Sequence, residues 1–119
     1  MLGLPEGALA LYPEDVYTEI RRRELGDLEL IGSSFAARRS LRRFGALTCP
    51  ETITRQGRVT IPAGFREFAG IEVNKEVYVV GTEIGVEIWA PERFDAEMLA
   101  IQEHLMKKRE QEMLADLDR

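Results

Sequence analysis

The sequence has little of what disulfide-bonded, zinc-dependent and membrane-spanning proteins need. Cys49 is the only cysteine among 119 residues, so no internal disulfide can form and a reducing compartment is expected. His104 is the only histidine, which leaves no Cys/His cluster for zinc. No apolar run approaches the roughly 20 residues that cross a bilayer, and the first residues do not resemble a signal peptide. These absences predict a cytoplasmic protein without a metal, a cofactor or a membrane contact.

Catalytic constellations are also missing from the sequence. No nucleophile stands in a recognisable pattern with a base, which predicts that the chain is not an enzyme and has no small-molecule substrate. Cys49, beside Pro50, is expected to be a small buried apolar group, and His104 a surface or packing residue. The acidic residues after Pro13 and Pro91 favour helix N-termini and predict no catalytic carboxylate pair.

Positive charge is concentrated in one segment. The net charge is −5, yet residues 36–66 hold seven arginines and one acid, a local charge of +6. The flanking segments, 1–35 and 67–119, carry −4 and −7. Arginine suits bidentate contacts with phosphate and guanine, so this segment is the candidate nucleic-acid contact despite the acidic total.

A pattern near the start recurs 78 residues later without a gap. Gly3 and Gly7 correspond to Gly81 and Gly85, and in both copies an apolar run and a Pro-Glu pair follow. The pattern predicts a hairpin turn, a short strand and a helix opened by proline. Two pseudo-repeats are therefore expected, the first incomplete, since only two residues precede Gly3.

The second copy has further elements in front of it. Residues 52–61 are expected to form a two-stranded ribbon with a tight turn at Gln56-Gly57, preceded by a strand segment at 47–49. Pro62 opens a predicted helix at 63–69 that Gly70 ends. Strands are predicted at 76–80 and 86–89.

Three longer helices are predicted. The first covers about 13–24, and the second begins at Ser33 or Ser34 and ends near Arg43, with Phe35, Leu41 and Phe44 as candidate buried residues. The third starts near Pro91. Its apolar stripe is expected to pack within the subunit or between subunits, and consists of Phe94, Met98, Ile101 and Leu105.

Residues 54–71, TRQGRVTIPAGFREFAGI, resemble the second half of the MraZ family, in the swapped-hairpin AbrB/SpoVT class. The likeness continues through 76–94 and reaches back to 36–46 and 2–17, so it covers nearly the whole chain. It implies an α+β fold, an AbrB-like swapped-hairpin β-barrel with flanking helices. The expected domains are a remnant of the first SpoVT-AbrB repeat (1–17), linking helices (18–46), the second SpoVT-AbrB domain (47–94) and a C-terminal helix (95–119).

The resemblance also implies which residues bind DNA. The family signature is D-x-x-x-R, and here its arginine is Arg58, while Thr54 occupies the aspartate position and cannot form an ion pair. A two-stranded ribbon fits the major groove, and the predicted contacts are Arg55, Gln56, Arg58 and Arg66. Four further arginines either contact DNA or form a solvated helix face: Arg38, Arg39, Arg42 and Arg43.

The predicted function is that of a nucleoid-associated, sequence-specific transcriptional repressor. The resemblance implies a homo-oligomer, possibly a ring, that binds repeated sites in double-stranded promoter DNA. One alternative is the antitoxin of a toxin–antitoxin pair, although a C-terminal segment without Pro or Gly after Pro91 does not suit a disordered toxin-binding tail. Another is an assembly module whose DNA binding has degenerated.

The offset of 78 also predicts that the chain begins about 25 residues too late. The apolar strand at 8–12 would then lack its hairpin mate and would need another subunit or be poorly ordered.

Overall fold

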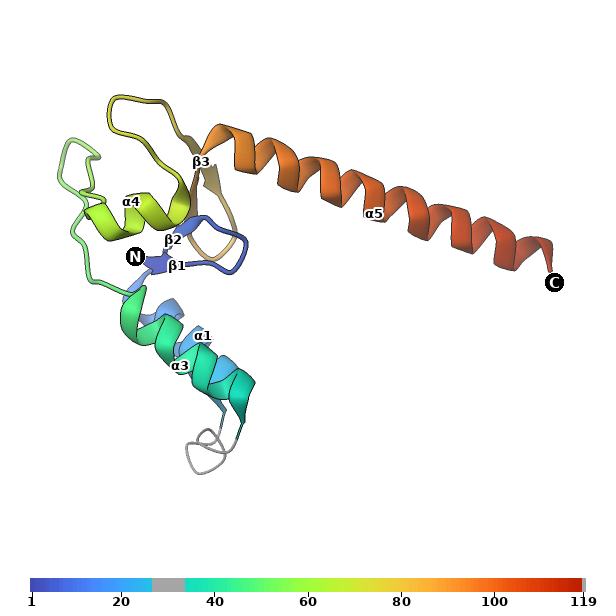
Figure 1. The fold of residues 1–119 in the computed structure, drawn as a ribbon, viewed down its shortest axis with the longest axis horizontal. Helices are drawn as coiled ribbons and strands as arrows, with labels where there is room; N and C mark the ends of the chain where they lie inside the picture. Colours follow the sequence, from blue (N-terminus) through green and yellow to red (C-terminus); the bar gives the residue numbers. More distant parts are fainter. Residues whose placement is uncertain (27–33, 119) are drawn as a thin grey trace.

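The computed structural model describes residues 1–26 and 34–118 and has the expected α+β composition (Figure 1). A small sheet with one short helix forms the body, two helices hang from one end of it, and one long helix leaves it (Figure 1). The elements in chain order are β1 (Leu2–Gly3), β2 (Leu9–Leu11), α1 (Glu14–Leu25), α3 (Phe35–Ala46), α4 (Ala63–Ala69), β3 (Tyr78–Gly81), β4 (Val86–Trp89) and α5 (Pro91–Leu117).

The sheet joins the two ends of the sequence. Its four strands are antiparallel in the order β1-β2-β4-β3, so two local hairpins meet at the central pair β2–β4. In that pair Leu9 is opposite Ile88 and Ala10 is opposite Glu87. At an offset of 78, Ile88 corresponds to Ala10 and Glu87 to Leu9, so the two pairings exchange under the repeat. This register is what two copies related by a twofold axis would give.

The strand predicted to lack a partner is in fact paired on both sides. β2 hydrogen-bonds to β1 in a tight hairpin and to β4 across the sheet. The turn of the first hairpin is closed by the Gly7 N–H, which donates to the Leu4 carbonyl at 2.9 Å, with Gly7 at a φ of 87°. The expectation of an unpaired strand was wrong because it considered only the local hairpin and not the distant second copy.

Apolar side chains cover both faces of the sheet. On one face Leu9 and Ile88 pack with Phe65 and Ala69 of α4. On the other face Trp89 packs with small residues of β2 and with Phe94, whose ring meets the indole edge-on at a centroid distance of 5.8 Å. The interpretation of Trp89 as a core residue is confirmed, since only 4% of it is exposed.

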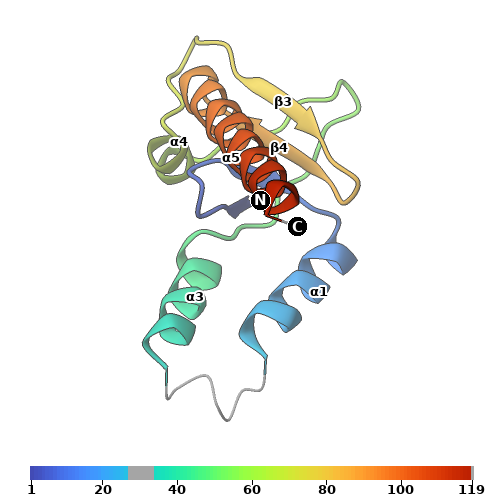
Figure 2. The same cartoon turned by 90° about the vertical axis from the view of Figure 1, so that its right-hand side faces the viewer.

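Helices α1 and α3 form a separate pair below the sheet (Figure 2). Tyr17 and Phe44 join them with rings 6.0 Å apart. The Ser34 hydroxyl accepts a hydrogen bond from the Ala37 N–H and caps α3, while the alternative cap, Ser33, lies outside the described residues. Phe35 was expected to be buried but is 65% exposed, because it is the first residue of α3 and points away from α1.

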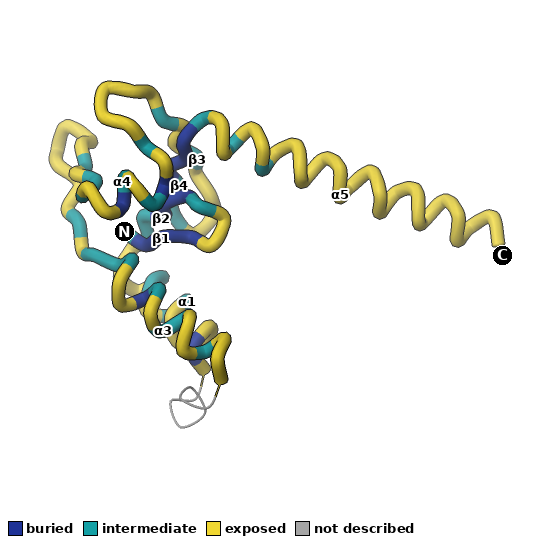
Figure 3. The backbone as a smooth tube through the Cα atoms, in the orientation of Figure 1, coloured by how far each residue is buried: buried dark blue, intermediate teal, exposed yellow. Residues whose placement is uncertain are grey.

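Helix α5 is exposed along almost its whole length (Figure 3). It begins at Pro91 and runs unbroken for 27 residues. Only its first turn packs on the body, through Phe94 against Tyr78 and Trp89. The stripe expected to pack within the subunit does not do so beyond Phe94: Met98, Ile101 and Leu105 are all exposed. No described helix, α5 included, is both long and apolar enough to cross a membrane.

Candidate nucleic-acid interface

The predicted ribbon at 52–61 is ordered only at its tip. The Thr54 N–H donates to the Arg58 carbonyl at 2.8 Å and the Gly57 N–H donates to the Thr54 carbonyl at 2.9 Å. Gly57 has a φ of 80°, as the tight turn requires. The structure assigns no strand to residues 50–62, so the expected two-stranded ladder is wrong beyond the tip. A lone two-stranded hairpin is marginal in water, and here only one flank, with Val59 and Ile61, reaches the core.

Thr54 closes the turn from inside. Its Oγ1 accepts a hydrogen bond from the Arg58 N–H at 3.0 Å, in addition to the backbone bond. The hydroxyl thus acts as an acceptor, whereas its expected contribution was as a donor. An aspartate carboxylate at this position could accept the same bond, so Thr54 keeps part of what the family's aspartate would provide, without its charge.

The arginines of the tip and those near it are in different situations. Arg55, Gln56 and Arg58 are exposed around the turn. Arg66, on α4, is half-buried, and its Nη1 donates to the Ile61 carbonyl at 2.6 Å. Arg66 therefore holds the junction between the ribbon and α4, a structural role that the sequence did not predict.

The four arginines of α3 lie on the helical pair, away from the ribbon tip (Figure 1). Arg38, Arg39 and Arg42 are exposed. Arg43 is only 18% exposed, forms an ion pair with Glu24 at 2.7 Å, and stacks over the Phe44 ring at 4.9 Å. Arg43 thus contributes to the contact between α1 and α3.

A functional contact that the sequence analysis missed is made by Arg93, at the start of α5. Its Nη1 donates to the Gly7 carbonyl at 2.9 Å and to the Phe68 carbonyl at 2.8 Å. Gly7 and Gly70 face this guanidinium, and a Cβ at either would lie within 3.0 Å of it. Arg93 therefore joins the first hairpin to the end of α4. The signal in the sequence was two glycines with no local explanation for both.

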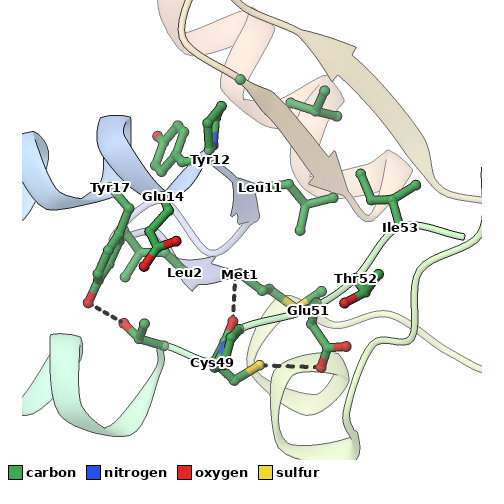
Figure 4. A pocket seen from close by; sticks show the side chains of 15 residues that line it. Met1, Leu2, Leu11, Tyr12, Glu14, Tyr17, Cys49, Glu51, Thr52 and Ile53 are labelled. Atoms are coloured by element: carbon green, nitrogen blue, oxygen red, sulfur yellow. Dashed lines mark hydrogen bonds between the residues drawn. The ribbon is translucent and has the colours of Figure 1, made fainter.

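An open hollow of about 760 Å³ lies beside the ribbon, between the start of α1 and the ends of β2 and β4 (Figure 4). Its walls are mainly apolar, and Leu11, Ile53 and Val86 are among them. At one side the Met1 ammonium donates to the Cys49 carbonyl at 2.7 Å, and the Cys49 thiol contacts Glu51 (Figure 4).

The titratable groups of the hollow are held in their protonated forms. Burial, followed by the hydrogen bond to Glu51, raises the pKa of the Cys49 thiol. Burial also raises the pKa of Tyr12, with Glu87 and Glu6 adding to the shift and Arg43 opposing it. A thiol reacts as the thiolate, so a raised pKa makes Cys49 a poor nucleophile. Among the described residues no three His, Cys, Asp or Glu side chains form a group that could hold a metal ion.

Comparison with known proteins identifies the family. The family model "MraZ protein, putative antitoxin-like" matches residues 51–116, which include the ribbon tip, α4 and most of α5. A transcriptional regulator MraZ of Desulforapulum autotrophicum is 32% identical over 117 residues, 98% of this chain and 75% of the relative. The chain belongs to the MraZ family.

Other MraZ relatives match over shorter stretches. The transcriptional regulator MraZ of Caldicellulosiruptor bescii is 42% identical over 66 residues, 56% of this chain and 45% of its own. That of Thermomicrobium roseum is 36% identical over 96 residues, 77% of this chain and 63% of its own. No solved structure matches the chain. MraZ proteins are transcriptional regulators and not enzymes, which confirms the non-enzymatic interpretation of the sequence.

Proposed function

We propose that this chain is a sequence-specific, DNA-binding transcriptional repressor that contacts double-stranded promoter DNA through the ribbon tip. The observation that carries the proposal is the exposed turn on which Arg55, Gln56 and Arg58 stand together, closed by Thr54 and Gly57. Its relatives in the MraZ family, named transcriptional regulators, support the regulatory part of the proposal.

The local charge favours nucleic acid although the chain as a whole is acidic. Residues 52–66 contain three arginines and no acidic residue. Binding to DNA depends on neutralising phosphates near the contact, and the Debye length is only about 8 Å at physiological ionic strength. The acidic residues of exposed α5 are therefore largely screened from a duplex held at the tip.

The tip has the chemistry for both positioning and base recognition. A narrow turn with an arginine on each side can enter the major groove, where Arg58 would form bidentate bonds to guanine and Gln56 to adenine. Arg55 would contact phosphate and set the register. The backbone around the turn is held by two hydrogen bonds across Thr54 and Arg58, so Arg58 starts from a defined position.

Assembly belongs to the same proposal. One tip contributes a modest contact, and several tips that bind repeated sites at once multiply it. The exposed apolar side chains of Ile53, on the ribbon, and Val79, on β3, are consistent with further subunits covering them. We therefore propose a homo-oligomer, with a ring as its closed form.

The test is Arg58→Ala, with Arg21→Ala on α1 as a control that removes the same charge elsewhere. In a mobility-shift titration on a promoter fragment, Arg58→Ala should lose about 1–3 kcal/mol of affinity, roughly 5- to 150-fold. Arg21→Ala should bind nearly as the wild type does. Both should keep the wild-type melting temperature, since exposed arginines contribute little to folding. Equal binding by Arg58→Ala and wild type would remove the tip from the DNA contact.

A second candidate is an antitoxin, which the description of the matching family names and the bare surface of α5 favours. Co-purification of a small basic toxin, lost when α5 is substituted, would support it. An assembly module without DNA binding is distinguished by the absence of a salt-dependent shift of promoter DNA.

A further inference from the structure

Helix α5 presents apolar side chains that nothing in the described chain covers. After Phe94, the exposed fractions of Met98, Ile101 and Leu105 are 38%, 42% and 58%. We call these four residues the seam, since steps of 4, 3 and 4 residues keep them on one side of a helix. An extended apolar stripe of this kind in water marks a contact surface.

The spacing of the seam is the same from either end. A second copy of α5 that runs in the opposite direction therefore matches it layer by layer, with Phe94 opposite Leu105 and Met98 opposite Ile101. This register gives four apolar layers and overlaps the helices over residues 91–108, about 27 Å of helix.

Charged residues decide between parallel and antiparallel pairing. The next two positions of the same stripe are Lys108 and Glu112. In a parallel pair each would face its own copy, which places two ammonium groups and then two carboxylates within the contact. In the antiparallel register the seam ends before these positions, so neither like-charge layer forms.

The charges beside the seam agree with the antiparallel direction. Lys107, Lys108 and Arg109 form a basic triplet, whereas the first turns of α5 are acidic, with Glu92, Asp95 and Glu97. Antiparallel pairing brings the triplet of each helix level with Glu92 of the other. Parallel pairing would place triplet beside triplet, which is repulsive.

We propose that α5 is the site where two copies of this chain pair, as antiparallel helices joined through Phe94, Met98, Ile101 and Leu105. This inference specifies one contact of the proposed homo-oligomer and rests on that part of the proposed function, but it does not depend on DNA binding. It also explains why α5 is helical well beyond its last contact with the body.

The seam is tested with Ile101→Lys, near the centre of the pair, against Met113→Lys. Met113 is 63% exposed on the same helix but lies outside the seam, so its substitution is a matched control. By light scattering the wild type and Met113→Lys should have at least twice the 13.5 kDa of one chain. Ile101→Lys should halve the mass of the assembly at the same concentration, with unchanged helical circular dichroism. Equal masses for all three proteins would overturn the proposal.

The direction is tested with a spin label on Gln111→Cys in a Cys49→Ser background. Gln111 is 11.5 residues from the centre of the antiparallel pair, so the two labels should be about 35 Å apart, against about 10 Å in a parallel pair. Pulsed dipolar spectroscopy measures this distance without DNA. A short distance, or a 35 Å distance that survives Ile101→Lys, would overturn the proposal. A 35 Å distance lost in Ile101→Lys, in a protein that fails to shift promoter DNA, would uphold the pairing and reject the DNA contact.

Discussion

The ribbon tip and the β3–β4 hairpin show how differently one chain can hold two turns. The β3–β4 hairpin has four paired residues on each strand, and Ile88 at its centre is 4% exposed. The tip is held by bonds among Thr54, Gly57 and Arg58 only, and its side chains face solvent. Core packing keeps the first hairpin in shape, whereas the second depends on a few local bonds. The segment that carries the proposed contacts therefore contributes little to the stability of the body.

The largest expected difference between the two regions is in stability. Leu9 is fully buried between the sheet and α4, so Leu9→Ala should lower the free energy of unfolding by about 2–5 kcal/mol. Ile53, on the ribbon, is 58% exposed, and Ile53→Ala should change it by less than about 0.5 kcal/mol in the isolated chain. Urea titration below the assembly concentration measures both values. A comparable loss in Ile53→Ala would show that the ribbon is part of the core.

A smaller difference is expected between two glycines of the β3–β4 hairpin. A Cβ at Gly85 would collide with the Leu11 carbonyl oxygen, which belongs to the rigid backbone of β2. Gly85→Ala should therefore cost about 1–3 kcal/mol. A Cβ at Gly81 meets nothing within 4 Å, so Gly81→Ala is the matched control and should stay within about 0.5 kcal/mol of wild type. Equal melting temperatures for the two variants would contradict the close approach of the second hairpin to β2.

The smallest expected effect concerns the tip itself. Thr54→Ala removes the acceptor of the Arg58 N–H and should weaken DNA binding by about 1 kcal/mol, roughly fivefold, with little change in melting temperature. Thr54→Ser keeps the acceptor and should bind as the wild type does. Thr54→Asp should keep or raise the affinity, because a carboxylate strengthens the same bond. Weaker binding by Thr54→Asp would instead indicate that repulsion from phosphate governs this position.

Sequence reasoning succeeded where local chemistry determines the structure. Helix α4 has the predicted ends, since Pro62 precedes its first turn and Gly70 adopts the left-handed conformation after its last residue. β4 also has the predicted bounds, because turn glycines and Pro91 delimit an apolar run. Elements of this kind depend on a few neighbouring residues, which a sequence shows directly.

It failed where an element depends on distant neighbours. The partner of β2 lies almost 80 residues away, so no local pattern could indicate it. The ribbon has the alternation of a strand pair but lacks a second layer to hold its outer flank, and therefore only its turn forms. Among the predicted site residues, Arg66 and Arg43 have the same composition signal as Arg58, but their guanidinium groups are engaged within the chain. The DNA contacts remain predictions for Arg55, Gln56 and Arg58.

The central pairing of the sheet has a consequence for how the protein folds during synthesis. β2 meets β4 through Leu9 and Ile88, which are 79 residues apart in the chain. At a translation rate of about 5–20 residues per second, β2 exists for roughly 4–16 s before its partner is made. During that time the β1–β2 hairpin exposes an unpaired strand edge and the apolar side chain of Leu9, the state most open to pairing with another nascent chain. We expect the sheet to close late and in one step, with the first hairpin protected until then only by its brevity.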